Sequence, residues 1–107
     1  MSNLTTYIKN YHKENGTEFD PQLIIFTLSG CPICTSLVTD LMIDGYAFEE
    51  FDCNKDKHSD IADYLENELK TNHYPIICIT YPEEKIITVD QLDQNKPIYN
   101  QVTEHLI

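Results

Sequence analysis

Two cysteines separated by two residues, Cys31-Pro32-Ile33-Cys34, are the part of this sequence best suited to chemistry. They come directly after a short apolar run and open a segment with helical periodicity. At a helix N-terminus, free backbone N–H groups and the helix dipole stabilise an anion, so we expect Cys31 to be held partly as a thiolate. Such a thiolate can attack a disulfide, and Cys34 can then release the mixed disulfide that forms. The motif therefore predicts thiol–disulfide exchange.

The other two cysteines leave a metal site open as an alternative interpretation of the pair. Zinc normally requires a second pair of ligands at short spacing. Cys53 and Cys78 lie far apart and each falls in a predicted strand, and His12, His58 and His105 show no ligand spacing, so we expect no bound metal. Cys78 is predicted to be a small buried core residue. Cys53 is either an inert, partly buried thiol or a site of oxidation or glutathionylation.

A strand before the cysteine pair and a helix after it are both predicted. Leu23 to Leu28 is an apolar run of strand length, and Ser29-Gly30 supplies a turn. Pro32 suits the first turn of a helix, where its missing N–H costs nothing. The apolar face that follows repeats at helical spacing until Asp44-Gly45, which predicts a helix of about three turns.

The second half of the chain completes a mixed sheet. Residues 46–53 are predicted to form a strand parallel to the first, because a helix connects the two. A helix is predicted from Ser59, as its cap, to about Lys70. Residues 75–79 and 85–89 are then predicted to form two strands of an antiparallel hairpin.

Helices are also predicted at the two ends of the chain. The N-terminal helix stops at Asn15-Gly16, and a short C-terminal helix follows the turn-rich segment 90–97. The positions that define them are Leu4, Tyr7, Ile8 and Tyr11 at one end and Ile98, Val102, His105 and Leu106 at the other. The aromatic residues expected to pack the N-terminal helix against the sheet are Tyr7, Tyr11, Phe19 and Phe26.

Length and charge limit the classes of function. The 107 residues suffice for one domain with a modest core. The net charge is -11, from 18 acidic and 7 basic residues, and every basic residue is Lys, which argues against binding of nucleic acid. The acidic residues between Asp40 and Glu68 either steer basic partners or simply form a solvated surface. The first residues lack the pattern of a signal peptide and no run is long enough to span a membrane, so we expect a cytoplasmic protein.

The order of elements, with Cys-Pro-x-Cys after the first strand and Tyr74-Pro75 before the third, resembles the glutaredoxin branch of the thioredoxin superfamily. The resemblance covers residues 22–107 and implies an α/β, thioredoxin-like (glutaredoxin) fold, with a central four-stranded mixed sheet and helices on both faces. Residues 1–21 are then an extra N-terminal helix packed on this domain.

The resemblance also implies roles for the residues of a site. Cys31 matches the nucleophile and Cys34 the resolving cysteine. Pro75 matches a cis-proline beside the cysteines, and the backbone of Tyr74 would receive a substrate as if it were an extra strand. A trans proline at the start of an edge strand is the alternative for Pro75. His73 either sits near the thiols, where its charge would favour the thiolate, or is a surface residue of the loop.

A glutathione or substrate site is implied around the same residues. Asp90 matches an Asp that would receive the γ-glutamyl ammonium of glutathione, beside Val89. The sequence departs from the family in three places: Ile33 stands where many members have Tyr, Leu28-Ser29 lacks the usual Lys, and the usual glycines before Asp90 are missing. The substrate-binding or glutathione-binding residues that the resemblance implies are Pro32, Ile33, His73, Tyr74, Pro75, Val89 and Asp90.

The implied activity is that of a glutaredoxin-like thiol–disulfide oxidoreductase. Its substrates would be protein disulfides or glutathione mixed disulfides, ribonucleotide reductase among them, with glutathione as reductant and no tightly bound cofactor. A monomer without nucleic-acid or membrane partners is expected. Two other classes stay open: an iron–sulfur or metal carrier that bridges two chains, and a non-catalytic interaction module that uses the acidic face or the N-terminal helix.

Overall fold

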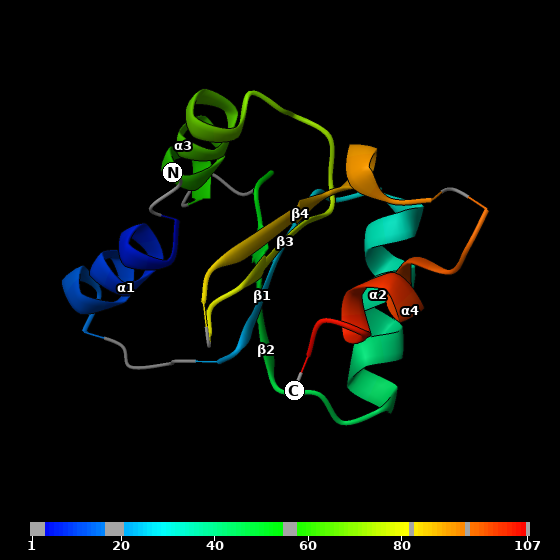
Figure 1. The fold of residues 1–107 in the computed structure, drawn as a ribbon. Helices are drawn as coiled ribbons and strands as arrows, with labels where there is room; N and C mark the ends of the chain where they lie inside the picture. Colours follow the sequence, from blue (N-terminus) through cyan, green and yellow to red (C-terminus); the bar gives the residue numbers. More distant parts are fainter. Residues whose placement is uncertain (1–3, 17–20, 55–57, 82, 94, 107) are drawn as a thin grey trace.

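A computed structural model describes residues 4–16, 21–54, 58–81, 83–93 and 95–106, and Figure 1 shows the arrangement of the elements. A single four-stranded sheet lies between two layers of helices, so the predicted α/β fold is confirmed. The elements in chain order are α1 (Leu4–Glu14), β1 (Leu23–Thr27), α2 (Pro32–Ile43), β2 (Phe48–Asp52), α3 (Ser59–Leu69), β3 (Ile76–Ile79), β4 (Lys85–Thr88), the short 3-10 helix η2 (Val89–Gln91) and α4 (Ile98–Thr103).

The sheet is mixed, as predicted, and its strand order is β2-β1-β3-β4. β1 pairs in parallel with β2, and Leu23 lies opposite Phe48. β1 and β3 are antiparallel, as are β3 and β4, whose register places Ile77 opposite Ile87. This order makes β1 an inner strand, and all five of its residues are buried. The chain leaves the sheet at the C-terminal end of β1 and enters α2. The cysteine pair therefore lies at that edge of the sheet.

Alternation along the inner strands builds a core on each face of the sheet. Figure 1 shows α1 and α3 covering one face and α2 and α4 covering the other. Side chains alternate between the two faces because successive residues of a strand point in opposite directions. The core under α1 and α3 contains Ile24, Phe26, Ile76 and Cys78, and the core under α2 and α4 contains Leu23, Ile25, Ile77 and Ile79.

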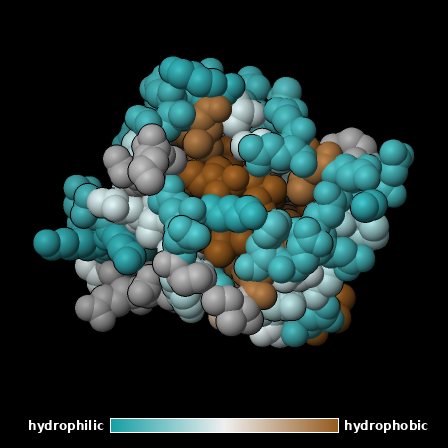
Figure 2. Space-filling model, viewed as in Figure 1, coloured by the Kyte–Doolittle hydropathy of each residue, from teal (hydrophilic) through white to brown (hydrophobic). Residues whose placement is uncertain are grey.

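Apolar surface is also visible along one edge of the molecule. Figure 2, in the orientation of Figure 1, shows hydrophobic residues gathered between the two helical layers over the edge strand β4, with hydrophilic residues around them. No helix in the described part of the chain combines the length and the apolar character needed to cross a membrane.

The N-terminal helix is held by aromatic packing and by one buried polar contact. The Tyr7 ring stacks on Tyr64 of α3, with centroids 3.9 Å apart, and Tyr11 meets Phe51 of β2 edge to face. His12 Nε2 lies 2.7 Å from Glu49 Oε1, and both side chains are largely buried. The prediction that these tyrosines pack is confirmed, although Tyr7 packs on α3 instead of on the sheet. Phe19 lies outside the described residues.

Glu49→Ala should destabilise the protein by about 1–3 kcal/mol, because His12 would lose this partner while its ring stays buried. Urea unfolding followed by far-UV circular dichroism measures the change. Asp63→Ala is the matched control, since Asp63 is an exposed acidic residue on α3. Equal unfolding midpoints for the two variants would show that the contact between His12 and Glu49 does not stabilise the packing of α1.

Several predicted element boundaries are corrected. The strands predicted over 23–28, 75–79 and 85–89 cover Leu23–Thr27, Ile76–Ile79 and Lys85–Thr88. β2 covers Phe48–Asp52 and not 46–53, because the Tyr46 N–H bonds back to the Leu41 carbonyl at the end of α2. Ser59 is the first residue of α3 and not its cap. His58 takes the cap position, and its buried ring bonds through Nδ1 to the carbonyl of Asp52 at 3.0 Å.

Candidate active site

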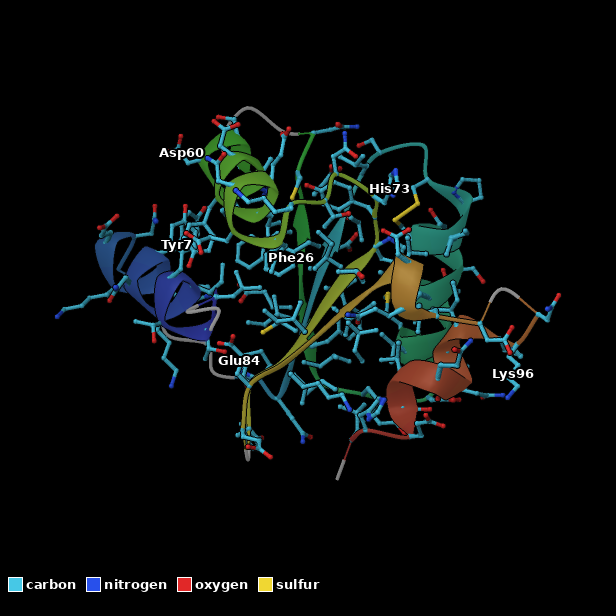
Figure 3. The ribbon with its side chains drawn as sticks, turned by 45° about the horizontal axis from the view of Figure 1, so that its top comes forward. Tyr7, Phe26, Asp60, His73, Glu84 and Lys96 are labelled. Carbon is cyan, nitrogen blue, oxygen red and sulfur yellow. A yellow bond between two sulfur atoms is a disulfide. The ribbon has the colours of Figure 1, made fainter. Side chains whose placement is uncertain are left out.

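Cys31 and Cys34 form a disulfide at the start of α2, with their Cα atoms 5.3 Å apart. Figure 3 shows this bond at the start of α2. Cys31 is the N-cap residue and Pro32 occupies the first turn, so the predicted start of the helix is confirmed. Gly30 adopts a φ of 81°, a conformation that other residues rarely reach, which lets the chain turn from β1 into the motif.

The two sulfur atoms differ in their environment. Cys31 is half-buried, whereas Cys34 is only 2 % exposed. The Cys34 backbone N–H donates to Cys31 Sγ at 3.2 Å, and the first turn of α2 contains no acidic residue. A thiolate at Cys31 would therefore be stabilised by a hydrogen bond and by the helix dipole. Cys31 can meet a substrate from solvent, and Cys34 can reach Cys31 from behind.

The loop before β3 lies against the cysteine pair, as the resemblance implies. The peptide bond between Tyr74 and Pro75 is cis, and the Tyr74 carbonyl oxygen lies 3.8 Å from Cys31 Sγ. The alternative prediction of a trans Pro75 is therefore wrong. Tyr74 and Pro75 come directly before β3, which places the Tyr74 carbonyl beside the Cys31 sulfur. These contacts bring together Cys31, Cys34, Tyr74 and Pro75, four of the predicted site residues.

The side chain of Tyr74 packs against the core under α1 and α3. Its hydroxyl donates a hydrogen bond to the Cys53 thiol, and the Cys53 thiol lies 3.9 Å from the Phe51 carbonyl. Burial, the nearby Cys53 and this hydrogen bond raise the pKa of Tyr74. Tyr74 therefore fixes the loop beside Cys31 while offering only its backbone to the site. The sequence alone did not reveal this contact, because Cys53 and Tyr74 are far apart in the chain.

His73 and Asp90 also come together, at the surface beside this loop. His73 Nδ1 lies 3.4 Å from Asp90 Oδ1, and both side chains are exposed. Figure 3 shows His73 on the side of the molecule that carries the disulfide. Asp90 belongs to η2, as does the half-buried Val89. The exposure of His73 agrees with the alternative prediction that it is a surface residue of the loop. Its partner, Asp90, is the carboxylate predicted to bind the glutathione ammonium.

A second carboxylate, that of Asp52, lies beside the turn at Ser29 that precedes the cysteine pair. Ser29 Oγ donates to Asp52 Oδ2 at 2.6 Å, and the Asn54 N–H donates to Asp52 Oδ1 at 3.0 Å. The turn before the cysteine pair is thus tied to the end of β2 by an acidic group. A negatively charged ligand group would be repelled from this turn.

The remaining cysteines are buried thiols. Burial raises the pKa of Cys53 to about 11, an effect that its bond with Tyr74 reduces in part. Burial likewise raises the pKa of Cys78 to about 11, and Thr5 Oγ1 lies 3.7 Å from Cys78 Sγ. The prediction that Cys78 is a core residue is confirmed. No group of three or more His, Cys, Asp or Glu residues in the described part of the chain is placed to hold a metal ion.

Thiol labelling should therefore separate the four cysteines. At pH 7.5 only about one in several thousand Cys53 or Cys78 thiols would be ionised, since the thiolate form appears only as the pH approaches a pKa near 11. After reduction, iodoacetamide should label Cys31 first and leave Cys53 and Cys78 unmodified, as peptide mass spectrometry would show. Labelling in denaturant, which should modify all four, is the control. Labelling of native Cys53 as fast as Cys31 would contradict this assignment.

Comparison with known proteins supports the fold. No protein-family model and no curated protein sequence matches the chain. A mutant form of the thioredoxin-like protein BC3987 superposes with a TM-score of 0.57 at 18% identity, covering 79% of this chain and 99% of that one. The glutaredoxin of Archaeoglobus fulgidus gives a TM-score of 0.57 at 14% identity, covering 78% and 84% of the two chains. The chain has a thioredoxin-like fold.

Proposed function

We propose that the protein is a glutaredoxin-like thiol–disulfide oxidoreductase that reduces protein disulfides or glutathione mixed disulfides. The observation that carries the proposal is the Cys31–Cys34 disulfide at the start of α2, with the backbone of Tyr74 beside Cys31. A disulfide between two cysteines of unequal burial is what this reaction leaves behind when the protein has given up two electrons.

The reaction would proceed in two exchanges. The Cys31 thiolate attacks one sulfur of the substrate disulfide, whose S–S bond breaks, and the second substrate sulfur leaves with the electron pair and takes a proton from water. Cys34 then loses its proton and attacks Cys31 Sγ, which releases the first substrate sulfur as a thiolate that is protonated in turn. The substrate gains two electrons and two protons, and the protein ends with the Cys31–Cys34 disulfide.

The loop before β3 would hold the substrate during the first exchange. The carbonyl of Tyr74 faces the reacting sulfur, and an extended substrate segment can pair with this backbone as an added strand. The unequal burial of the two cysteines supports this order of events, because Cys34 stays buried until the mixed disulfide has formed.

Glutathione is the reductant we propose for the return step. Two glutathione thiols would reduce the Cys31–Cys34 disulfide and leave as oxidised glutathione. The exposed carboxylate of Asp90 could accept the glutathione ammonium, which would displace His73 from its ion pair. Asp52 would oppose the glutathione carboxylates at the Ser29 turn, so a reductase protein is the alternative electron donor.

A coupled assay tests the proposal and separates the two donors. The protein is given a disulfide-bonded protein substrate and NADPH, together with either glutathione and glutathione reductase or a thioredoxin-type reductase. We expect NADPH oxidation above the rate of the reducing system alone with at least one donor, and with glutathione if the proposed return step holds. Rates equal to the background with both donors would overturn the proposed function.

A further inference from the structure

A groove of about 310 Å³ begins at Pro32 and Ile33, between the two cysteines in the sequence, and is lined by α2 and by the start of α4. Pro32, Ser36 and Asp40 are spaced four residues apart and so lie in one row along the helix. This row leads from the first turn of α2 to its middle. The residues that line the groove are Pro32, Ile33, Ser36, Leu37, Asp40, Pro97, Ile98 and Tyr99.

Apolar side chains form most of the groove, and a carboxylate lies in its lining. Leu37 is buried beneath it, and Ile33, a residue of the cysteine motif itself, is 41 % exposed at the end near the disulfide. Asp40 is exposed, and within the described residues its carboxylate forms no hydrogen bond or ion pair. Among the residues that line the groove, Asp40 alone carries a charge at neutral pH.

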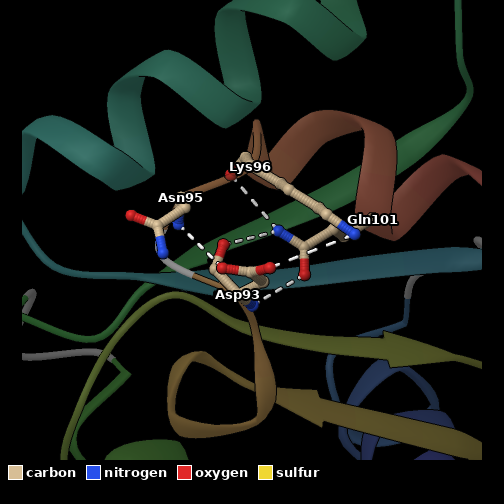
Figure 4. A network of polar contacts seen from close by, with 4 residues as sticks. All are labelled: Asp93, Asn95, Lys96 and Gln101. Atoms are coloured by element: carbon tan, nitrogen blue, oxygen red, sulfur yellow. Dashed lines mark hydrogen bonds and ion pairs between the residues drawn. The ribbon is translucent and has the colours of Figure 1, made fainter.

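The α4 side of the groove is held in place by a hydrogen-bond network, which Figure 4 shows. The Gln101 side chain accepts from the Asp93 N–H at 2.8 Å and donates to the carbonyls of Asp93 and Lys96 at 2.9 and 3.2 Å. Lys96 Nζ lies 4.0 Å from Asp93 Oδ2, so this cation faces Asp93 and does not line the groove. The negative charge of Asp40 therefore lacks a neighbouring cation within the groove.

We infer that this groove binds a segment of the protein substrate that carries a Lys or Arg, which pairs with Asp40 while the cysteine of the segment reaches Cys31. The inference rests on the proposed function and adds a substrate preference to it. Charge complementarity selects the occupant: a carboxylate without a cation in an apolar groove favours a basic, partly apolar peptide. The net charge of -11 would strengthen the attraction.

The length of the groove fixes where the cation belongs. Pro32 and Asp40 are eight residues apart on α2, which corresponds to about 12 Å along the helix axis. An extended peptide covers about 3.3 Å per residue, so this distance spans roughly three to four residues. The Lys or Arg should therefore lie about three residues from the reactive cysteine of the substrate.

Synthetic peptides can test this preference without a recycling system. Each peptide contains one cysteine, joined in a mixed disulfide to 2-mercaptoethanol, and carries Lys, Ala or Glu at the third residue before or after that cysteine. The pre-reduced protein is mixed with each peptide and quenched in acid, and the second-order rate constant for its oxidation is followed by intact mass. On one side of the cysteine we expect the Lys peptide to react about two- to fivefold faster than the Ala peptide, and the Glu peptide to be slowest.

Variants then assign the preference to Asp40. Asp40→Asn should remove it and Asp40→Lys should reverse it, and the preference of the unaltered protein should weaken at high salt because the pair is exposed. Asp63→Lys changes the net charge as much as Asp40→Lys but lies on α3, across the sheet, so it should keep the preference.

Three results would overturn the inference: equal rates for the Lys, Ala and Glu peptides, a preference that survives in Asp40→Lys, or rates that fall for all peptides alike as protein concentration rises. The last would indicate that a second copy of the chain covers the groove. Bis(2-hydroxyethyl) disulfide is too small to reach Asp40, so all variants should reduce it equally. Failure of the unaltered protein with this compound would count against the proposed function itself.

Discussion

Cys31→Ser should lower disulfide reduction by at least about a thousandfold, to the rate of the reducing system alone. A serine hydroxyl is similar in shape to the thiol and somewhat smaller, but it cannot form or exchange a disulfide, so the first exchange has no nucleophile. Cys34 cannot replace it, because Cys34 is buried behind the site. The coupled NADPH assay, with the donor that supports turnover, gives the measurement.

Cys78→Ser is a control for this variant, since it removes a thiol from the core and leaves the motif intact. It should lose some stability and keep turnover within a fewfold of the unaltered protein, because Cys78 lies beside Thr5 in the core under α1 and α3 and is not one of the site residues. Circular dichroism should show that Cys31→Ser is folded. Full activity in folded Cys31→Ser protein would remove Cys31 from the reaction.

Phe26→Ala should destabilise the fold by about 3–5 kcal/mol. Phe26 is fully buried in the core under α1 and α3, and its ring stacks on Phe51 with centroids 5.6 Å apart. Figure 3 shows it in the interior of the molecule. The loss is a large part of the roughly 5–15 kcal/mol that stabilises a typical domain. A lower urea midpoint, followed by far-UV circular dichroism, is the expected result.

Tyr81→Ala removes an aromatic ring of similar size from the surface and is the matched comparison for Phe26. The Tyr81 side chain is exposed, and the hydrogen bond it takes part in uses only its backbone carbonyl. Its unfolding midpoint should stay near that of the unaltered protein. If Phe26→Ala were no less stable than Tyr81→Ala, the core under α1 and α3 could not be packed as described.

Local patterns in the sequence were sufficient to predict the elements that position the cysteines. The apolar run before the motif, Pro32 after Cys31 and the stop at Asp44-Gly45 each have a local physical meaning, and α2 has the predicted start. The cis bond before Pro75 came from the resemblance, because it does not follow from a local pattern, and the order of the strands in the sheet was not predicted. The comparisons with solved structures then support the fold independently.

Contacts between distant residues were beyond the reach of the sequence. His12 and His58 carried no recognisable signal, yet both are buried, one against Glu49 and the other on the Asp52 carbonyl. A histidine in or beside an amphipathic helix can be buried or exposed, and only tertiary packing determines which position it takes. The hydrogen bond between Tyr74 and Cys53 also joins residues that are distant in the sequence. The groove that ends at Asp40 could not be predicted either, because it forms only where α4 lies beside α2.

Trapping of the first intermediate tests most directly whether Cys31 is the nucleophile and Cys34 the resolving cysteine. Reduced Cys34→Ser protein is incubated with oxidised glutathione, and the site of each adduct is mapped by mass spectrometry. We predict one stable glutathione adduct, on Cys31, whereas the unaltered protein under the same conditions should pass on to the Cys31–Cys34 disulfide. An adduct on Cys53 or Cys78 in place of Cys31, or no adduct at all, would contradict the account.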